Sequence, residues 1–195
     1  MRNILATIIS LSLFLMVGFL AYMYYPENHF ALEYQKVADC QRQKDIHRAA
    51  ELIERYFELT GHYPLDSPPA HREISVILTE EALPRQFKVN PPPEIRGELI
   101  PAAELKRTLE QTLKEKIRLP ADPQTAFAWG SRYYLYRLDT GGNYSLSATL
   151  FSRTTHTLEQ DRYRHSYHVG SKKSEHEGMR RYIDIAGEVL ECAAP

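Results

Sequence analysis

The chain has 195 residues, of which 43% are hydrophobic, and this is enough for one domain that buries its own core. Its 24 basic and 25 acidic residues nearly balance, so the sequence lacks the strongly basic surface that nucleic-acid-binding proteins need. We therefore expect no nucleic-acid partner.

The first element is an apolar run from Ile4 to Tyr25 that contains no charged residue. As a helix it would be about 33 Å long, which is enough to cross a hydrocarbon core of about 30 Å. The sequence therefore predicts a transmembrane anchor over residues 1–26, with the lipid bilayer as the partner of residues 4–25. Residues 27–195 are then expected to form one domain outside the membrane.

A cleaved secretory signal is the alternative interpretation of the same run. Such signals have an apolar region of about 7 to 15 residues, whereas this run continues into the tyrosine cluster before Pro26. The tyrosines suit the outer interface of a bilayer. Because Arg2 precedes the run and the next basic side chain after it is Lys36, we expect a cytoplasmic N-terminus and a periplasmic domain.

A second helical pattern follows Pro26 and runs to about Thr60, where Gly61 and Pro64 predict its end. At about 100° per residue, one broad apolar face is predicted to lie on the core. That face consists of Ile46, Ala49, Ala50, Ile53, Tyr56 and Phe57.

The same helix carries a second group of apolar residues about 140° away from the first. We call this group the interaction stripe, and it consists of Phe30, Tyr34, Val37, Leu52 and Leu59. Either loops of the chain itself or a neighbouring protein could cover it. The polar stretch Gln41 to Lys44 separates the two parts of the stripe.

The middle of the chain is rich in proline from Asp66 to Pro101. Within it, Arg72 to Ala82 is predicted to form a short helix. A further helix is predicted over Ala102 to Ile117, because leucines recur there every four residues.

The last third of the chain shows the two-residue alternation of strands. Tyr133 to Leu138 and Tyr144 to Leu150 are predicted to pair as a hairpin around the paired glycines of Asp139 to Gly142. Arg162 to Val169 and Arg181 to Ala186 are further strand candidates. The predicted fold class is α+β, with a long N-terminal helix packed on a C-terminal antiparallel sheet.

Two cysteines, Cys40 and Cys192, lie far apart in the sequence. In the oxidising compartment that the predicted orientation implies, we expect them to form a disulfide bond with each other. Two separate buried thiols, or a C-terminal tail too mobile to pair, are the alternatives.

No motif in the chain predicts catalysis. His165 and His168 would face opposite sides of a strand, and the sequence contains no known metal-ligand spacing and no G-x-S-x-G, so we expect no catalytic residue, metal or cofactor. The strand tyrosines could form a ligand-binding platform or simply pack the sheet. These tyrosines are Tyr133, Tyr134, Tyr136, Tyr163 and Tyr167.

The order of these parts resembles the type IV pilin-like proteins, especially the major, G-like pseudopilins of type II secretion. In those proteins the helix ends with a tyrosine and a Gly-x-Tyr-Pro sequence. In this chain Tyr56, Gly61, Tyr63 and Pro64 match that pattern. Their Leu-Pro-x-Asp-Pro, followed by Tyr-x-Tyr and Tyr-x-Leu, is matched by Leu119, Pro120, Asp122, Pro123, Tyr134, Tyr136, Tyr144 and Leu146. The resemblance covers the chain from the anchor to Leu150.

The chain departs from this family between Met1 and Tyr25. The usual basic leader, Gly-Phe-like cleavage junction and glutamate inside the apolar helix are not recognisable there. The resemblance implies a non-enzymatic component of a bacterial type II secretion or type IV pilus system in the inner membrane. It also implies other pilin-like or secretion-machinery proteins as partners. An anchored periplasmic ligand-binding or sensor domain is the alternative.

Overall fold

The structure is a computed structural model that describes residues 11–21, 29–79, 91–122, 133–150, 157–161, 164–171 and 179–181. Side chains are described for these residues except 29–35, 157–161, 164–165 and 179–181. After a helix over residues 11–21, the elements are α2 (His29–Thr60), β1 (Ile74–Leu78), β2 (Glu98–Leu99), α4 (Ala102–Leu113), β3 (Tyr134–Leu138), β4 (Tyr144–Leu150), β5 (Thr157–Asp161), β6 (Arg164–Gly170) and β7 (Met179–Arg181).

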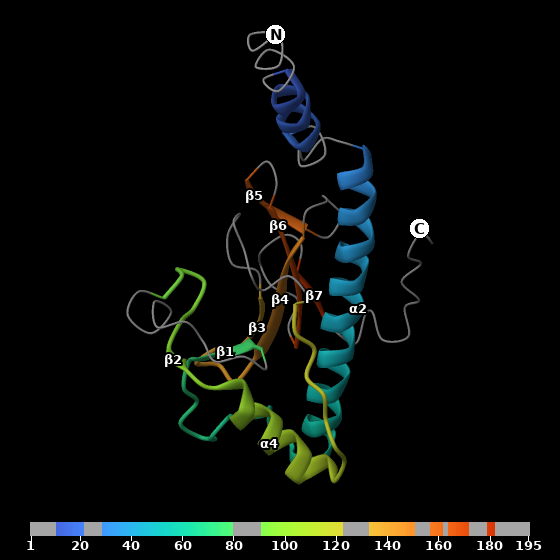
Figure 1. Ribbon diagram of the computed structural model, residues 1–195. Coiled ribbons are helices and arrows are strands. Elements are labelled where there is room, and N and C mark those ends of the chain that lie inside the picture. The colour runs from blue at the N-terminus through green and yellow to red at the C-terminus, as the bar shows by residue number, and fades with distance from the viewer. Residues whose placement is uncertain are drawn as a thin grey trace.

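The strands of the described residues form one mostly antiparallel sheet in the order β2-β1-β3-β4-β6-β5, with β7 paired to β6. The pairs β1 with β2 and β6 with β7 are parallel, and the other pairs are antiparallel. Helix α2 packs on β4 and β6, while α4 packs on α2 and β1 at the C-terminal end of α2 (Figure 1). The α+β class and the long helix on an antiparallel sheet are thus confirmed.

Helix α2 ends at Thr60, as predicted, and Gly61 follows it with a φ of 75°. Five of the six predicted core residues of this helix are buried, from Ile46 at 0% to Tyr56 at 6% exposure. Phe57 differs, because it is 37% exposed and stacks on Tyr63 with ring centroids 4.5 Å apart. The predicted helical periodicity therefore selects the packing face correctly.

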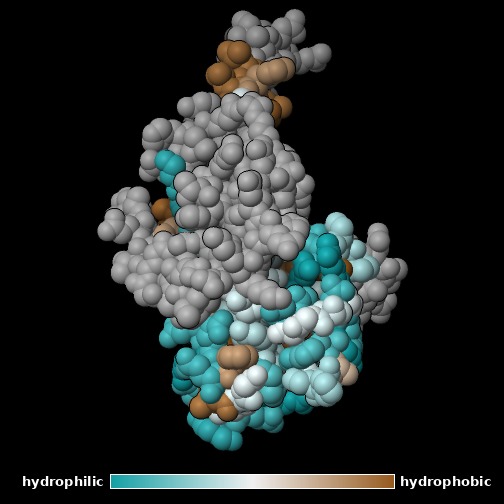
Figure 2. Space-filling view, turned by 180° about the vertical axis from the view of Figure 1, so that it is seen from behind, coloured by the Kyte–Doolittle hydropathy of each residue, from teal (hydrophilic) through white to brown (hydrophobic). Residues whose placement is uncertain are grey.

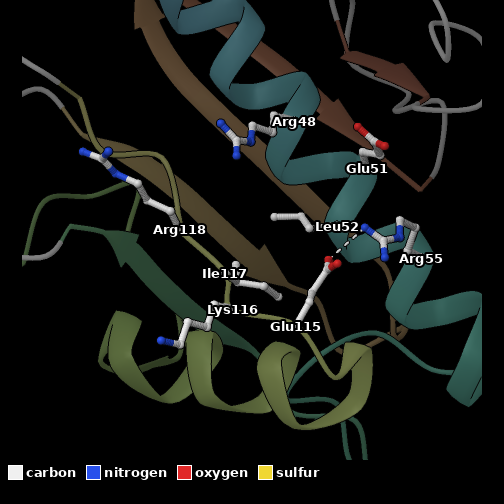
Figure 3. A pocket seen from close by; sticks show the side chains of 8 residues that line it. All are labelled: Arg48, Glu51, Leu52, Arg55, Glu115, Lys116, Ile117 and Arg118. Carbon is white, nitrogen blue, oxygen red and sulfur yellow. Dashed lines mark hydrogen bonds and ion pairs between the residues drawn. The ribbon is translucent and has the colours of Figure 1, made fainter.

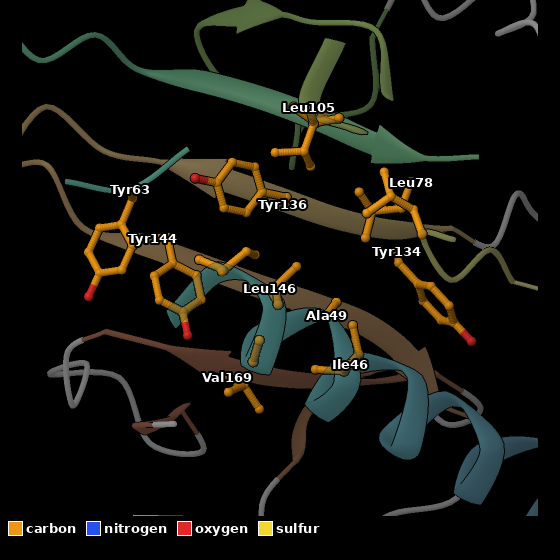
Figure 4. Packing of buried hydrophobic residues seen from close by; sticks show 14 of the residues in the cluster. Ile46, Ala49, Tyr63, Leu78, Leu105, Tyr134, Tyr136, Tyr144, Leu146 and Val169 are labelled. Atoms are coloured by element: carbon orange, nitrogen blue, oxygen red, sulfur yellow. The ribbon is translucent and has the colours of Figure 1, made fainter. Parts of the chain in front are cut away.

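The sheet meets this face of α2 with large aromatic side chains (Figure 4). Tyr134, Tyr136 and Tyr167 are fully buried and Tyr144 is 1% exposed. Leu146 lies among them at 0% exposure, and Tyr63 packs on Tyr144 with ring centroids 4.7 Å apart. Tyrosine supplies most of the aromatic bulk of this core, and the hydroxyls of Tyr134, Tyr136 and Tyr167 find polar partners.

The predicted hairpin between β3 and β4 is confirmed. Alternate residues of β4 are buried, from Tyr144 to Leu150, as the sequence pattern requires. In the turn, the amide of Asp139 donates to the carbonyl of Asn143 at 2.9 Å, and Gly142 adopts a φ of 71°. The Asp139 side chain also accepts from the Gly141 amide at 2.8 Å, which fixes the turn locally.

The prediction of a helix over Arg72 to Ala82 is wrong, because Ile74–Leu78 forms strand β1. All five residues of β1 are buried, and the strand pairs with β2 on one side and β3 on the other. Short apolar runs fit either a buried strand or a buried helix by periodicity alone, and here the β-branched residues Ile74, Val76 and Ile77 favour the strand.

The helix predicted from Ala102 to Ile117 is confirmed but is shorter, since α4 ends at Leu113. Lys114 adopts a left-handed conformation with a φ of 57° and its amide donates to the carbonyl of Glu110. The chain then runs on with Ile117 and Leu119 buried in the core at 5% and 8% exposure. This turn therefore redirects residues 115–119 along α2.

Gly97 lies where β2 approaches the residue that precedes β1. It has a φ of 64°, and a Cβ added there would overlap the backbone carbonyl of Glu73. We expect Gly97→Ala to lower the free energy of unfolding by more than about 1 kcal/mol, because it adds this clash to the strain of the positive φ. Urea unfolding measures the change.

Gly61→Ala is the matched control, because Gly61 also has a positive φ but a Cβ there would meet open space. Gly61→Ala should lower the free energy of unfolding only by the backbone strain of the positive φ. If Gly97→Ala proved no more costly than Gly61→Ala, the close approach at Glu73 would be disproved.

Candidate interaction surface

The helix over residues 11–21 exposes its apolar side chains on all sides. The large apolar residues of this segment are between 42% and 80% exposed, with Phe14 the most exposed. Figure 2 shows these residues gathered near one end of the molecule, whereas the described surface at the opposite end is mostly hydrophilic. Apolar surface of this extent in one place is typical of segments that contact lipid or another protein.

The predicted anchor extends beyond this helix, and residues 4–10 and 22–25 lie outside the described residues. Within the ranges that the structure describes, no helix combines the length and the hydropathy needed to cross a membrane.

The interaction stripe on α2 is partly exposed. Val37 is 40% exposed and Leu59 is 67% exposed, and from helical geometry they lie about 40° apart around the helix and about 33 Å apart along it. Leu52 is instead partly buried and packs against the core. The side chains of Phe30 and Tyr34 lie outside those described. Among the stripe residues whose side chains the structure describes, Val37 and Leu59 are therefore the exposed ones.

A buried ionic cluster, which the sequence did not predict, joins α2 to the segment before β3. Arg42 is 0% exposed, and both Asp39 and Asp122 are 3% exposed. Arg42 Nε donates to Asp122 Oδ2 at 2.8 Å and Nη2 donates to Asp122 Oδ1 at 3.2 Å. Its Nη1 donates to Asp39 Oδ1 at 3.0 Å. The bidentate contact fixes both position and orientation of the loop carboxylate.

The electrostatics of this cluster favour the charged guanidinium. Burial alone lowers the pKa of Arg42, but the hydrogen bonds and charges of Asp122 and Asp39 outweigh it and raise the pKa. Because all three side chains are buried, the cluster is suited to holding residues 119–122 against the helix. It offers no exposed group for a ligand.

The strand tyrosines do not form a surface platform among the residues described. Tyr134 donates to Asp45 Oδ2 and Tyr136 donates to the carbonyl of Pro64, each at 2.8 Å. The hydroxyl of Tyr167 lies 2.6 Å from His47 Nε2. Burial raises the pKa of Tyr136 well above its usual value, so the hydroxyl stays a neutral donor. Tyr133 is half-buried, and Tyr163 lies outside the described residues.

Two further sets of residues were considered in the sequence, namely the cysteines of the predicted disulfide and the two histidines of a predicted strand. Cys40 is half-buried on α2 and is not a free thiol, whereas Cys192 lies outside the described residues, so the pairing of these two cysteines stays a prediction. His168 is half-buried on β6, whereas the side chain of His165 lies outside those described. Within the described part of the chain, no group of three or more His, Cys, Asp or Glu side chains is placed to hold a metal ion.

Comparisons of the chain with protein families, with curated proteins and with solved structures found no match.

Proposed function

We propose that this chain is a non-enzymatic, membrane-anchored, pseudopilin-like structural or accessory component of a bacterial type II secretion or type IV pilus system. The observation that carries the proposal is the arrangement of α2. This helix of 32 residues starts shortly after an apolar segment, buries one face on an antiparallel sheet and leaves Val37 and Leu59 exposed.

Two further features support it. Exposed apolar side chains surround the helix over residues 11–21, which suits a segment embedded in lipid. Asp122, a residue of the motif that resembles the pilin-like proteins, holds its loop to α2 through Arg42. In this proposal residues 4–25 cross the inner membrane, the N-terminus is cytoplasmic, and residues 27–195 lie in the periplasm.

Cell fractionation and photo-crosslinking test the proposal. A photoreactive amino acid at position 37 or 59 of the full chain should crosslink to a second copy or to another membrane-anchored subunit of the machine. The same group at Arg107, an exposed residue of α4, is the positional control.

We expect Val37→Glu combined with Leu59→Glu to reduce partner recovery about tenfold, because burying a charge in an apolar contact is costly. Crosslinking from the neighbouring position 36 measures this loss. Circular dichroism should stay unchanged, since both side chains are exposed. Recovery of the full chain in the soluble fraction, or unaltered crosslinks in the double variant, would contradict the proposal.

A further inference from the structure

A depression of about 270 Å³ lies between α2 and the segment that follows α4. Arg48, Glu51, Leu52 and Arg55 line it from α2, and Glu115, Lys116, Ile117 and Arg118 line it from the other side. Figure 3 shows the charged side chains around Leu52 and Ile117. Two segments that lie 60 or more positions apart thus build one small polar hollow with an apolar floor.

The alternation of buried and exposed residues places basic side chains at the rim of this depression. Ile117 and Leu119 are buried, so the alternate residues Lys116 and Arg118 are exposed at the rim. Arg48 and Arg55 are exposed on α2, two helical turns apart. The lining holds four basic and two acidic side chains, which leaves an excess of positive charge.

One of these cations already binds a carboxylate. Arg55 Nη1 donates to Glu115 Oε1 at 3.0 Å, and the two side chains are 44% and 43% exposed. An ion pair this exposed is weak and exchanges readily with solvent. Within the described residues, the side chains of Arg48, Lys116 and Arg118 make no hydrogen bond or ion pair. Room therefore remains for further carboxylates.

We infer that this depression is a docking site for an acidic segment of a partner protein, with an aliphatic side chain between its carboxylates. The cations at the rim would bind the carboxylates, and the aliphatic side chain would contact Leu52 and Ile117. The volume lies below the range of about 300 to 1,000 Å³ that is usual for small-molecule sites, which favours one or two side chains over a metabolite.

The choice of a protein over an anionic membrane rests on the proposed function. Arg48 lies 19 residues after the start of α2, which places it about 28 Å along the helix from the end nearer the predicted anchor. Lipid headgroups would not reach it. An acidic protein segment is not limited in this way.

Fluorescence anisotropy with the full chain in non-ionic detergent tests the inference. The probe is a fluorescein-labelled peptide with the sequence Glu-Glu-Leu-Glu-Glu. The variant is Arg48→Glu with Arg118→Glu, and the matched control is Lys36→Glu with Arg107→Glu, which changes the net charge equally outside the depression. We expect the first pair to weaken peptide binding about tenfold or more, and the control to change it less than about threefold.

Replacing the central leucine of the peptide with glycine should also weaken binding, since the apolar floor then has no partner. Equal weakening by both double variants would overturn the inference in favour of general electrostatics. Undetectable peptide binding would overturn it, as would preferred binding to phosphatidylglycerol vesicles that needs Arg48 and Arg118. Membrane fractionation and the crosslinks from positions 37 and 59 report on the proposed function separately, because neither position lines this depression.

Discussion

Replacing Arg42 with methionine should lower the free energy of unfolding by about 3 to 5 kcal/mol, because Asp39 and Asp122 would then remain buried without their cation. Methionine keeps much of the side-chain volume, so the loss reports on charge and hydrogen bonding more than on a cavity. Urea unfolding followed by circular dichroism measures it.

Two controls sharpen this experiment. Arg55→Met removes the exposed ion pair with Glu115 and should cost no more than about 1 kcal/mol. Combining Arg42→Met with Asp39→Asn and Asp122→Asn removes the uncompensated charges and should recover much of the loss. Equal costs for Arg42→Met and Arg55→Met would show that the buried cluster does not hold the loop to α2.

The second large effect is expected from Leu146→Ala. Leu146 is fully buried at the centre of β4, where it pairs across the sheet with Tyr136 on β3 and Val169 on β6. Truncation should lower the free energy of unfolding by about 2 to 5 kcal/mol, because it removes apolar contacts and leaves a cavity against α2. Thermal or urea unfolding gives the value.

Leu59→Ala makes the same chemical change at a position that is 67% exposed. It should alter stability by less than about 0.5 kcal/mol, while it reduces the crosslinking yield if α2 contacts a partner there. A similar loss of stability at both positions would contradict the placement of Leu59 on the outer side of the helix.

The sequence predicted the elements whose pattern is regular and local. The end of α2 at Thr60 follows from Gly61 and Pro64, and the β3–β4 hairpin follows from alternation around Gly142. The core face of α2 follows from helical periodicity, with Phe57 as the exception. These signals depend on neighbours within a few residues, so tertiary context alters them little.

The errors concern features that only distant contacts decide. Ile74–Leu78 is short and apolar, and its pairing with β2 and β3 makes it a strand. Arg42 lies in a polar stretch that resembles a solvated helix face, yet Asp122, which is 80 positions away, makes its burial possible. No local signal in the sequence marks Arg42. Asp122 was noted in the sequence only because it belongs to the Leu-Pro-x-Asp-Pro motif.

The candidate surface was predictable in part for the same reason. Helical angles placed Val37 and Leu59 away from the core face of α2, but they could not show that Leu52 would pack inward. The depression between α2 and residues 115–118 has no signature in the sequence, because it forms only when the left-handed turn at Lys114 returns the chain to the helix.

The contact between His47 and Tyr167 joins residues 120 positions apart. During translation at about 5 to 20 residues per second, the apolar face of α2 would leave the ribosome about 6 to 24 seconds before β6 is available to cover it. Nascent α2 is therefore exposed to aggregation, and a chaperone that shields it during this interval should increase the yield of folded protein.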